Sequence, residues 1–197
     1  MRTAVFSPLL LLAMAAQAQQ SRGELQLVAG LQLTYASNGA PSPPWQVESV
    51  ERDLAIGGRA GCLRVRFAPG GPRSGPDVRV TCEDQGMLFA WDSTRSTWRP
   101  SRPIQGGGTL DLQSGRNRLR FVASASSVDT VAGHLVRVIE TTMVTSDSTL
   151  APIRRLRERY APALGTATWG VFERPDPASP GGWTVDQEFK IVGIKLP

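Results

Sequence analysis

The chain reads CLRVRF from Cys62 to Phe67 and VRVTC from Val78 to Cys82. In both stretches apolar and polar side chains alternate with a period of two, which is typical of a half-buried β-strand. The loop between them, 68–77, holds three glycines and three prolines and is predicted to be an exposed connector. The pattern predicts a hairpin in which the face of Leu63, Val65 and Phe67 is shared with Val78, Val80 and Cys82.

The same alternation runs along most of the chain. It recurs in 31–35, 45–49, 87–91, 110–121, 135–145 and 183–196, with turn signals such as Asn38-Gly39 and Ser114-Gly115 between strands. The 20 glycines and 15 prolines fit many short strands joined by turns, and 197 residues are the length of one domain. We therefore predict a mainly all-β protein, built as a single antiparallel sheet that is strongly curved or a half-barrel, with at most one short helix.

Residues 1–18, MRTAVFSPLLLLAMAAQA, have the features of a secretory signal peptide. Arg2 provides the basic start, the apolar run is shorter than the roughly 20 residues that span a bilayer, and Ala16-Gln17-Ala18 has the small-x-small pattern of a cleavage site. We predict cleavage after Ala18. The mature chain is then one β-rich domain over 19–197, with no membrane span, in the periplasm or the medium of a bacterium.

The two cysteines, Cys62 and Cys82, end the two strands of the predicted hairpin. In an exported protein such a pair is expected to be oxidised, so we predict a structural disulfide between them. Cys62 is out of phase with the apolar face of its own strand. A direct bridge across the hairpin is therefore expected to need a bulge or a twist near one end.

The basic residues are twenty arginines and two lysines, and the formal net charge of +5 falls to +4 when Arg2 is removed. This bias fits GC-rich bacterial coding. The arginines form no tract and accompany no nucleic-acid-binding motif, so we predict no nucleic-acid partner. One local cluster could meet an anion or a partner, although such a run is usually a solvated face. It consists of Arg154, Arg155, Arg157 and Arg159.

The chain carries few signs of catalysis. His134 is the only histidine, and no nucleophile elbow or zinc-binding motif accompanies it, so we predict no cofactor, no metal and no catalytic residue. Aromatic side chains on a curved sheet can line an apolar cavity or fill the core. The five tryptophans, Trp45, Trp91, Trp98, Trp169 and Trp183, are therefore candidates for facing a ligand.

The stretch 148–160 is ambiguous. Ile153, Leu156 and Tyr160 are spaced as in a helix, while Leu156, Glu158 and Tyr160 alternate with arginines as in a strand. The pattern alone slightly favours a short helix.

The last third of the chain combines Arg157-Glu158-Arg159-Tyr160-Ala161-Pro162-x-x-Gly165 with Gly170-x-Phe172-Glu173 and a final apolar strand after Trp183. Together with Gly30-Leu31-x-Leu33-x-Tyr35, this resembles uncharacterised exported bacterial proteins and lipoproteins. In those proteins the Tyr-Ala-Pro-x-x-Gly element lies between two late strands of a half-barrel-like sheet. The resemblance implies a strand at Leu156–Tyr160 and implies no activity. The chain lacks the lipidated cysteine of the lipoprotein members.

Three functions follow as hypotheses. The first is a non-catalytic binding or carrier module whose concave sheet face holds an apolar ligand or an envelope partner. The second is a structural or protein-interaction component of the cell envelope, which would use sheet edges or the Arg154–Arg159 face. The third is a hydrolase that uses His134 with a serine.

Overall fold

The computed structural model describes residues 25–69 and 78–197. The predicted signal peptide 1–18 and most of the predicted connector 68–77 lie outside the described residues. In the described ranges the chain forms thirteen strands and one 3₁₀ turn. They are β1 (Gln32–Ser37), β2 (Ala40–Pro41), β3 (Trp45–Ile56), β4 (Arg59–Phe67), β5 (Val78–Asp84), β6 (Met87–Asp92), β7 (Thr97–Pro103), β8 (Thr109–Ser114), β9 (Asn117–Val131), β10 (His134–Ser146), β11 (Pro152–Ala161), η1 (Pro162–Leu164), β12 (Thr166–Pro175) and β13 (Trp183–Lys195).

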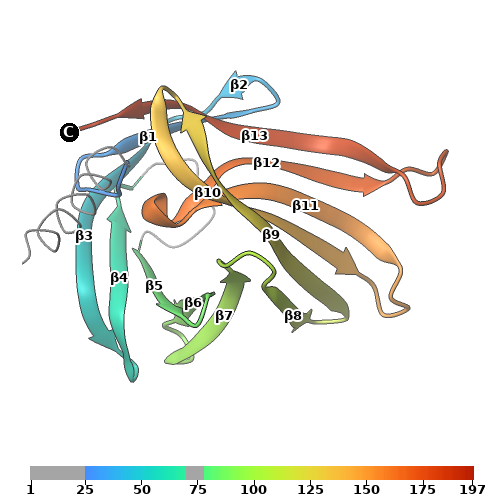
Figure 1. Ribbon diagram of the computed structural model, residues 1–197, viewed down its shortest axis with the longest axis horizontal. Helices are drawn as coiled ribbons and strands as arrows, with labels where there is room; N and C mark the ends of the chain where they lie inside the picture. The colour runs from blue at the N-terminus through green and yellow to red at the C-terminus, as the bar shows by residue number, and fades with distance from the viewer. Residues whose placement is uncertain (1–24, 70–77) are drawn as a thin grey trace, which may run out of the picture.

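The strands form a single antiparallel sheet that curves into an open half-barrel (Figure 1). Their order is β7-β6-β5-β4-β3-β1-β13-β12-β11-β10-β9-β8, and β2 pairs only with β1. The end strands β7 and β8 lie close together, but no ladder between them closes the described sheet. The predicted fold class, an all-β protein with one curved antiparallel sheet, is confirmed.

Strand β1 joins the two halves of the sheet. It pairs with the last strand, β13, along its whole length, and its first two residues also pair with β3. The predicted Asn38-Gly39 turn follows β1, and both residues have positive φ, 48° and 84°. The first and last segments of the described chain are thereby neighbours at the middle of the sheet.

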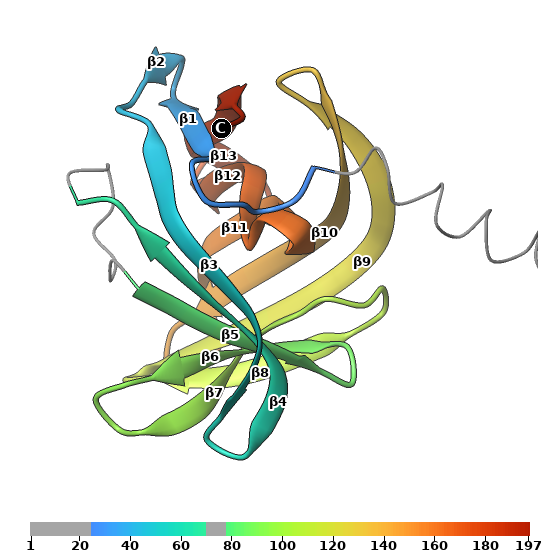
Figure 2. The ribbon, with the colours of Figure 1, turned by 90° about the vertical axis from the view of Figure 1, so that its left-hand side faces the viewer.

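The apolar core lies toward one end of the half-barrel. The segment before β1 crosses this end beside η1 (Figure 2), where the Leu27 N–H donates to the Ala163 carbonyl over 3.0 Å. Leu27, Leu31 and Leu164 are almost completely buried there.

The helix favoured by the pattern of 148–160 is wrong, since the chain forms strand β11 there, as the resemblance implies for its second half. Strand β11 is hydrogen-bonded between β10 and β12, so both of its edges are satisfied. Ile153, a member of the supposed helical stripe, is 43% exposed, whereas Glu158 and Tyr160 are buried at the period of a strand.

The predicted disulfide between Cys62 and Cys82 is confirmed, with Cα atoms 4.3 Å apart. The predicted faces of the hairpin are wrong. Leu63 pairs with Thr81 and Val65 pairs with Arg79, without a register shift between the described residues of β4 and β5. This register places the two cysteines directly opposite each other, so the bridge needs no bulge. It also places Arg79 and Thr81, rather than Val78 and Val80, on the face of Leu63 and Val65.

Candidate functional site

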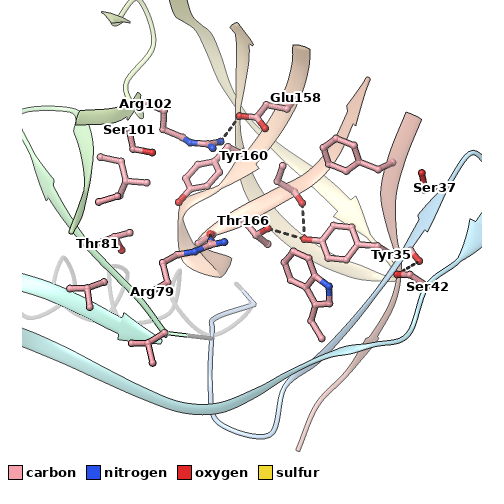
Figure 3. A pocket seen from close by; sticks show the side chains of 18 of the residues that line it. Tyr35, Ser37, Ser42, Arg79, Thr81, Ser101, Arg102, Glu158, Tyr160 and Thr166 are labelled. Atoms are coloured by element: carbon pink, nitrogen blue, oxygen red, sulfur yellow. Dashed lines mark hydrogen bonds and ion pairs between the residues drawn. The ribbon is translucent and has the colours of Figure 1, made fainter. Parts of the chain in front are cut away.

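A cavity of about 680 Å³ lies inside the half-barrel next to the core. Its volume is in the range of roughly 300–1,000 Å³ that is usual for small-molecule sites. Its lining comes from both halves of the sheet, with residues of β1, β3, β5, β6, β7, β11, β12 and β13 (Figure 3). The site is therefore assembled only when the sheet has curved and its distant strands face one another.

Arg79 on β5 points into this cavity (Figure 3). Its guanidinium donates a hydrogen bond to the Gly165 carbonyl and lies 5.8 Å from the centre of the Phe67 ring. In the described ranges no carboxylate forms an ion pair with Arg79. Burial, together with the neighbouring Arg102 charge, lowers the pKa of Arg79 below its usual value. The cavity thus holds a positive charge that no carboxylate of the described residues neutralises directly.

Arg102 on β7 is the second cation of the cavity, and it is held in place by Glu158 and Tyr160. It forms an ion pair with Glu158, whose same oxygen accepts a hydrogen bond from the Thr141 hydroxyl over 3.1 Å. The guanidinium also lies 4.3 Å from the centre of the Tyr160 ring. The Nε–H of Arg102 is buried and has no hydrogen-bond partner among the described residues. Arg102 is therefore fixed in position, and its unpaired Nε–H is buried away from the open space of the cavity.

The charged groups of the lining do not cancel. Arg79 and Arg102 contribute two positive charges and Glu158 contributes one negative charge, and the other described lining residues are uncharged. The sum is one net positive charge in a partly enclosed space, where charges interact more strongly than in bulk water. This arrangement favours an anionic group over a neutral or cationic one.

Tyr35 on β1 forms the opposite wall. Its hydroxyl donates to the Ala167 carbonyl over 3.0 Å and is hydrogen-bonded to Thr166 Oγ1 over 2.9 Å, and its ring lies 4.7 Å from that of Trp45. Burial raises the pKa of Tyr35 to about 12, although Thr166 and Arg79 act in the opposite direction. The phenol therefore stays neutral at physiological pH and provides shape and a hydrogen-bonding edge.

An apolar ladder continues from the cavity along the concave face of the sheet. Phe189 lines the cavity, and its ring centre is 5.9 Å from that of Phe172 on β12. Phe172 is paired with Leu156 on β11, and each following strand places an apolar residue opposite the last. From β12 to β8 the ladder consists of Phe172, Leu156, Met143, Phe121 and Leu110.

Gly170 leaves room for the Phe189 ring at the entrance to this ladder. A Cβ atom on Gly170 would lie 2.5 Å from Cζ of Phe189 and 3.2 Å from the Arg157 carbonyl oxygen. We expect Gly170→Ala to displace the ring and to lower the free energy of unfolding by about 1–3 kcal/mol, measured by urea denaturation. Gly106→Ala is the matched control, because its Cβ would meet only an ordinary 3.5 Å contact. Equal stability of the two variants would contradict this role of Gly170.

The structure separates the five tryptophans. Trp45 and Trp91 are among the residues that line the cavity. Trp98 is outside the lining and packs against Trp91, with ring centres 5.1 Å apart. Trp169 and Trp183 are also outside it, and each lies beside an arginine of β11. Only two of the five candidates are therefore placed where they can meet a ligand of this cavity.

The arginines of β11 are divided between the two faces of the sheet. Arg155 and Arg157 both form ion pairs with Glu173, and Arg159 forms ion pairs with carboxylates of β9 and β10. Burial raises the pKa of Glu173, but the hydrogen bonds and charges of its two arginines outweigh this effect and hold it below its usual value. Arg154 instead lies 4.3 Å from the centre of the Phe172 ring. The cluster is thus largely neutralised by its own neighbours.

His134 is the first residue of β10, beside the turn that joins β9 to β10. Its side chain has no hydrogen bond or ion pair within 25–69 and 78–197. The same described ranges contain no group of three side chains that could hold a metal ion. They also contain no helix that is long and apolar enough to cross a membrane.

Sequence reasoning missed the three charged residues of the cavity as site residues. For Arg79 a signal was present in the cysteine pair. If Cys62 and Cys82 are opposite each other in an antiparallel hairpin, three residues further along each strand Val65 is opposite Arg79, on the buried face. For Glu158, the alternation with Leu156 and Tyr160 was the signal. Arg102 lies between two prolines, Pro100 and Pro103, which obscured the strand pattern of β7.

Comparisons of the chain with protein-family models, with curated proteins and with solved structures found no match. The function is therefore argued from the cavity itself.

Proposed function

We propose that the protein is an exported, non-catalytic binding or carrier module that holds a small, mainly apolar molecule in the cavity of the half-barrel. The observation that carries this proposal is the cavity of about 680 Å³, whose lining includes Phe189, which packs against Phe172 at the start of the apolar ladder. Apolar cavities with a few well-placed polar groups are typical of ligand-binding sites.

The polar groups of the cavity support binding in preference to proton transfer. The pKa of Tyr35 is raised to about 12, so the phenol is poorly suited to act as a base near neutral pH. Arginine keeps its proton under ordinary conditions and serves as a hydrogen-bond donor and a fixed charge. A role in the cell envelope through the arginine face has less support, because Arg155, Arg157 and Arg159 already have carboxylate partners.

The disulfide supports the exported location in the proposal. Cys62 and Cys82 are both almost completely buried and joined to each other. Disulfides persist in oxidising compartments such as the periplasm and the extracellular space.

Titration with a neutral apolar fluorophore such as N-phenylnaphthylamine tests the binding function. We expect saturable binding, with energy transfer from Trp45 and Trp91, which line the cavity. Ala90→Trp fills part of the cavity and is expected to weaken binding about tenfold. Ala125→Trp, at an exposed position of β9, is the matched control and is expected to bind like the wild type. Absence of saturable binding, or equal binding by Ala90→Trp, would contradict the proposal.

A further inference from the structure

The inference that follows rests on the proposed function and names the head group of the ligand. We propose that Arg79 and Arg102 bind the negative charge of a single-chain amphiphile with a monoanionic head group, and that its alkyl chain leaves the cavity over Phe189 and Phe172. Carboxylate and sulfate heads share this chemistry, and the experiment below distinguishes them.

Arg79 carries the first step of the argument. A guanidinium has five N–H donors in a planar fork, and the one described hydrogen bond of Arg79 goes to the Gly165 carbonyl. The group lies on the buried side of β5, close enough to Arg102 for the two charges to repel. An uncompensated charge in such a place is unfavourable unless it acquires a partner. A monoanion in the cavity would neutralise it and accept two parallel hydrogen bonds from the fork.

Arg102 supplies the second contact. Its ion pair with Glu158 and its position over the Tyr160 ring hold the guanidinium beside the space that Arg79 faces (Figure 3). Because Glu158 already balances one of the two arginines, the site is matched to a single negative charge.

The apolar residues set the direction of the chain. Phe189 belongs to the cavity lining, and Phe172 and Leu156 continue the surface on the next two strands, where the Arg154 guanidinium lies 4.3 Å from the centre of the Phe172 ring. Gly170 lets the Phe189 ring pack closely over β12, since even a methyl group there would collide with the ring. A charged head at Arg79 and an apolar chain over Phe189 thus use adjacent parts of one continuous surface.

The test holds the alkyl chain constant and varies the head. Dodecanoate, dodecyl sulfate, dodecanol and dodecyltrimethylammonium are each titrated, below micelle-forming concentrations, into the oxidised protein loaded with N-phenylnaphthylamine. We expect both anions to displace the probe at concentrations at least about tenfold lower than dodecanol does. The cation is expected to need the highest concentration. A stronger effect of dodecanoate would identify a carboxylate head, and a stronger effect of dodecyl sulfate would identify a sulfate-like head.

Three variants assign the effect to the cavity. Arg79→Gln is expected to make the two anions bind no more tightly than dodecanol. The affinity of this variant for dodecanol is expected to stay within about twofold of the wild-type value. Glu158→Gln is expected to tighten binding of the anions, because it removes the carboxylate that competes for Arg102. Arg66→Gln, at an exposed position of the neighbouring strand β4, is the matched control. It is expected to change neither the affinity for the anions nor that for dodecanol.

The outcomes separate this inference from the proposed function. If dodecanol binds as tightly as the anions, or if Arg79→Gln leaves the preference unchanged, the head-group assignment is wrong and the apolar binding function stands. If the probe itself does not bind, the proposed function fails, and the head-group assignment fails with it. If Glu158→Gln does not fold, the comparison of Arg79→Gln with Arg66→Gln decides the assignment.

Discussion

Replacing Glu158 by leucine is expected to lower the free energy of unfolding by about 3 kcal/mol, at the lower end of the range for breaking a buried ion pair. The Glu158 side chain is 7% exposed, and that of its partner Arg102 is 22% exposed. The substitution leaves Arg102 without its carboxylate in a cavity that already contains Arg79. It also removes the acceptor of the Thr141 hydroxyl. Urea denaturation, followed by tryptophan fluorescence, measures the effect.

Two further variants show whether the loss comes from the unpaired charge. Replacing both partners, Arg102→Met with Glu158→Leu, is expected to recover most of the stability, because no uncompensated ion remains from the pair. Glu51→Leu breaks the exposed ion pair with Arg64 and is expected to cost less than about 1 kcal/mol. If Glu158→Leu is no more destabilising than Glu51→Leu, the ion pair between Arg102 and Glu158 does not behave as a buried pair.

Removal of the disulfide by the double substitution Cys62→Ala and Cys82→Ala is expected to cost about 3 kcal/mol. The two cysteines are 20 residues apart, and closing a loop of this length restricts the unfolded chain by about that amount. The bridge also joins β4 and β5 at opposite positions, so it holds the register that turns Arg79 toward the interior. Urea denaturation of the oxidised wild type and of the double variant measures the difference.

A reducing agent provides the control for this prediction. We expect reduction to destabilise the wild type by about the same amount and to leave the double variant unchanged. Equal unfolding midpoints for the oxidised and reduced wild type would contradict a stabilising role of the bridge.

Much of the strand content could be predicted because its signals are local. Alternation at 62–67 and 135–145 and turn residues such as Asn38 and Gly39 depend only on neighbouring positions, and the corresponding strands and turn are present. Strand β11 was harder to predict, because its residues fit both the period of a helix and that of a strand. The strand forms because pairing with β10 and β12 provides hydrogen-bond partners for the backbone of β11 on both edges.

The site was less accessible to prediction. Two of the five tryptophan candidates line the cavity, while none of its charged residues was among the predicted site residues. The predicted hairpin face consists of Val78, Val80 and Cys82 and omits Arg79, and the pairing register reverses that choice. In a strand, a shift of one residue exchanges the two faces, so a small error in register removes a functional residue from the site.

Sequence alone was enough to predict an all-β chain with many short strands and a bridge between Cys62 and Cys82, because periodicity, turn chemistry and cysteine pairing need little long-range information. Tertiary structure decided which strands became neighbours, and hence that Arg102 meets Glu158, which lies 56 residues away, and that Tyr35 meets Thr166, 131 residues away. The physical reason is that the cavity exists only between segments brought together by the curvature of the sheet. The charge inside it follows from that curvature and from the pairing register.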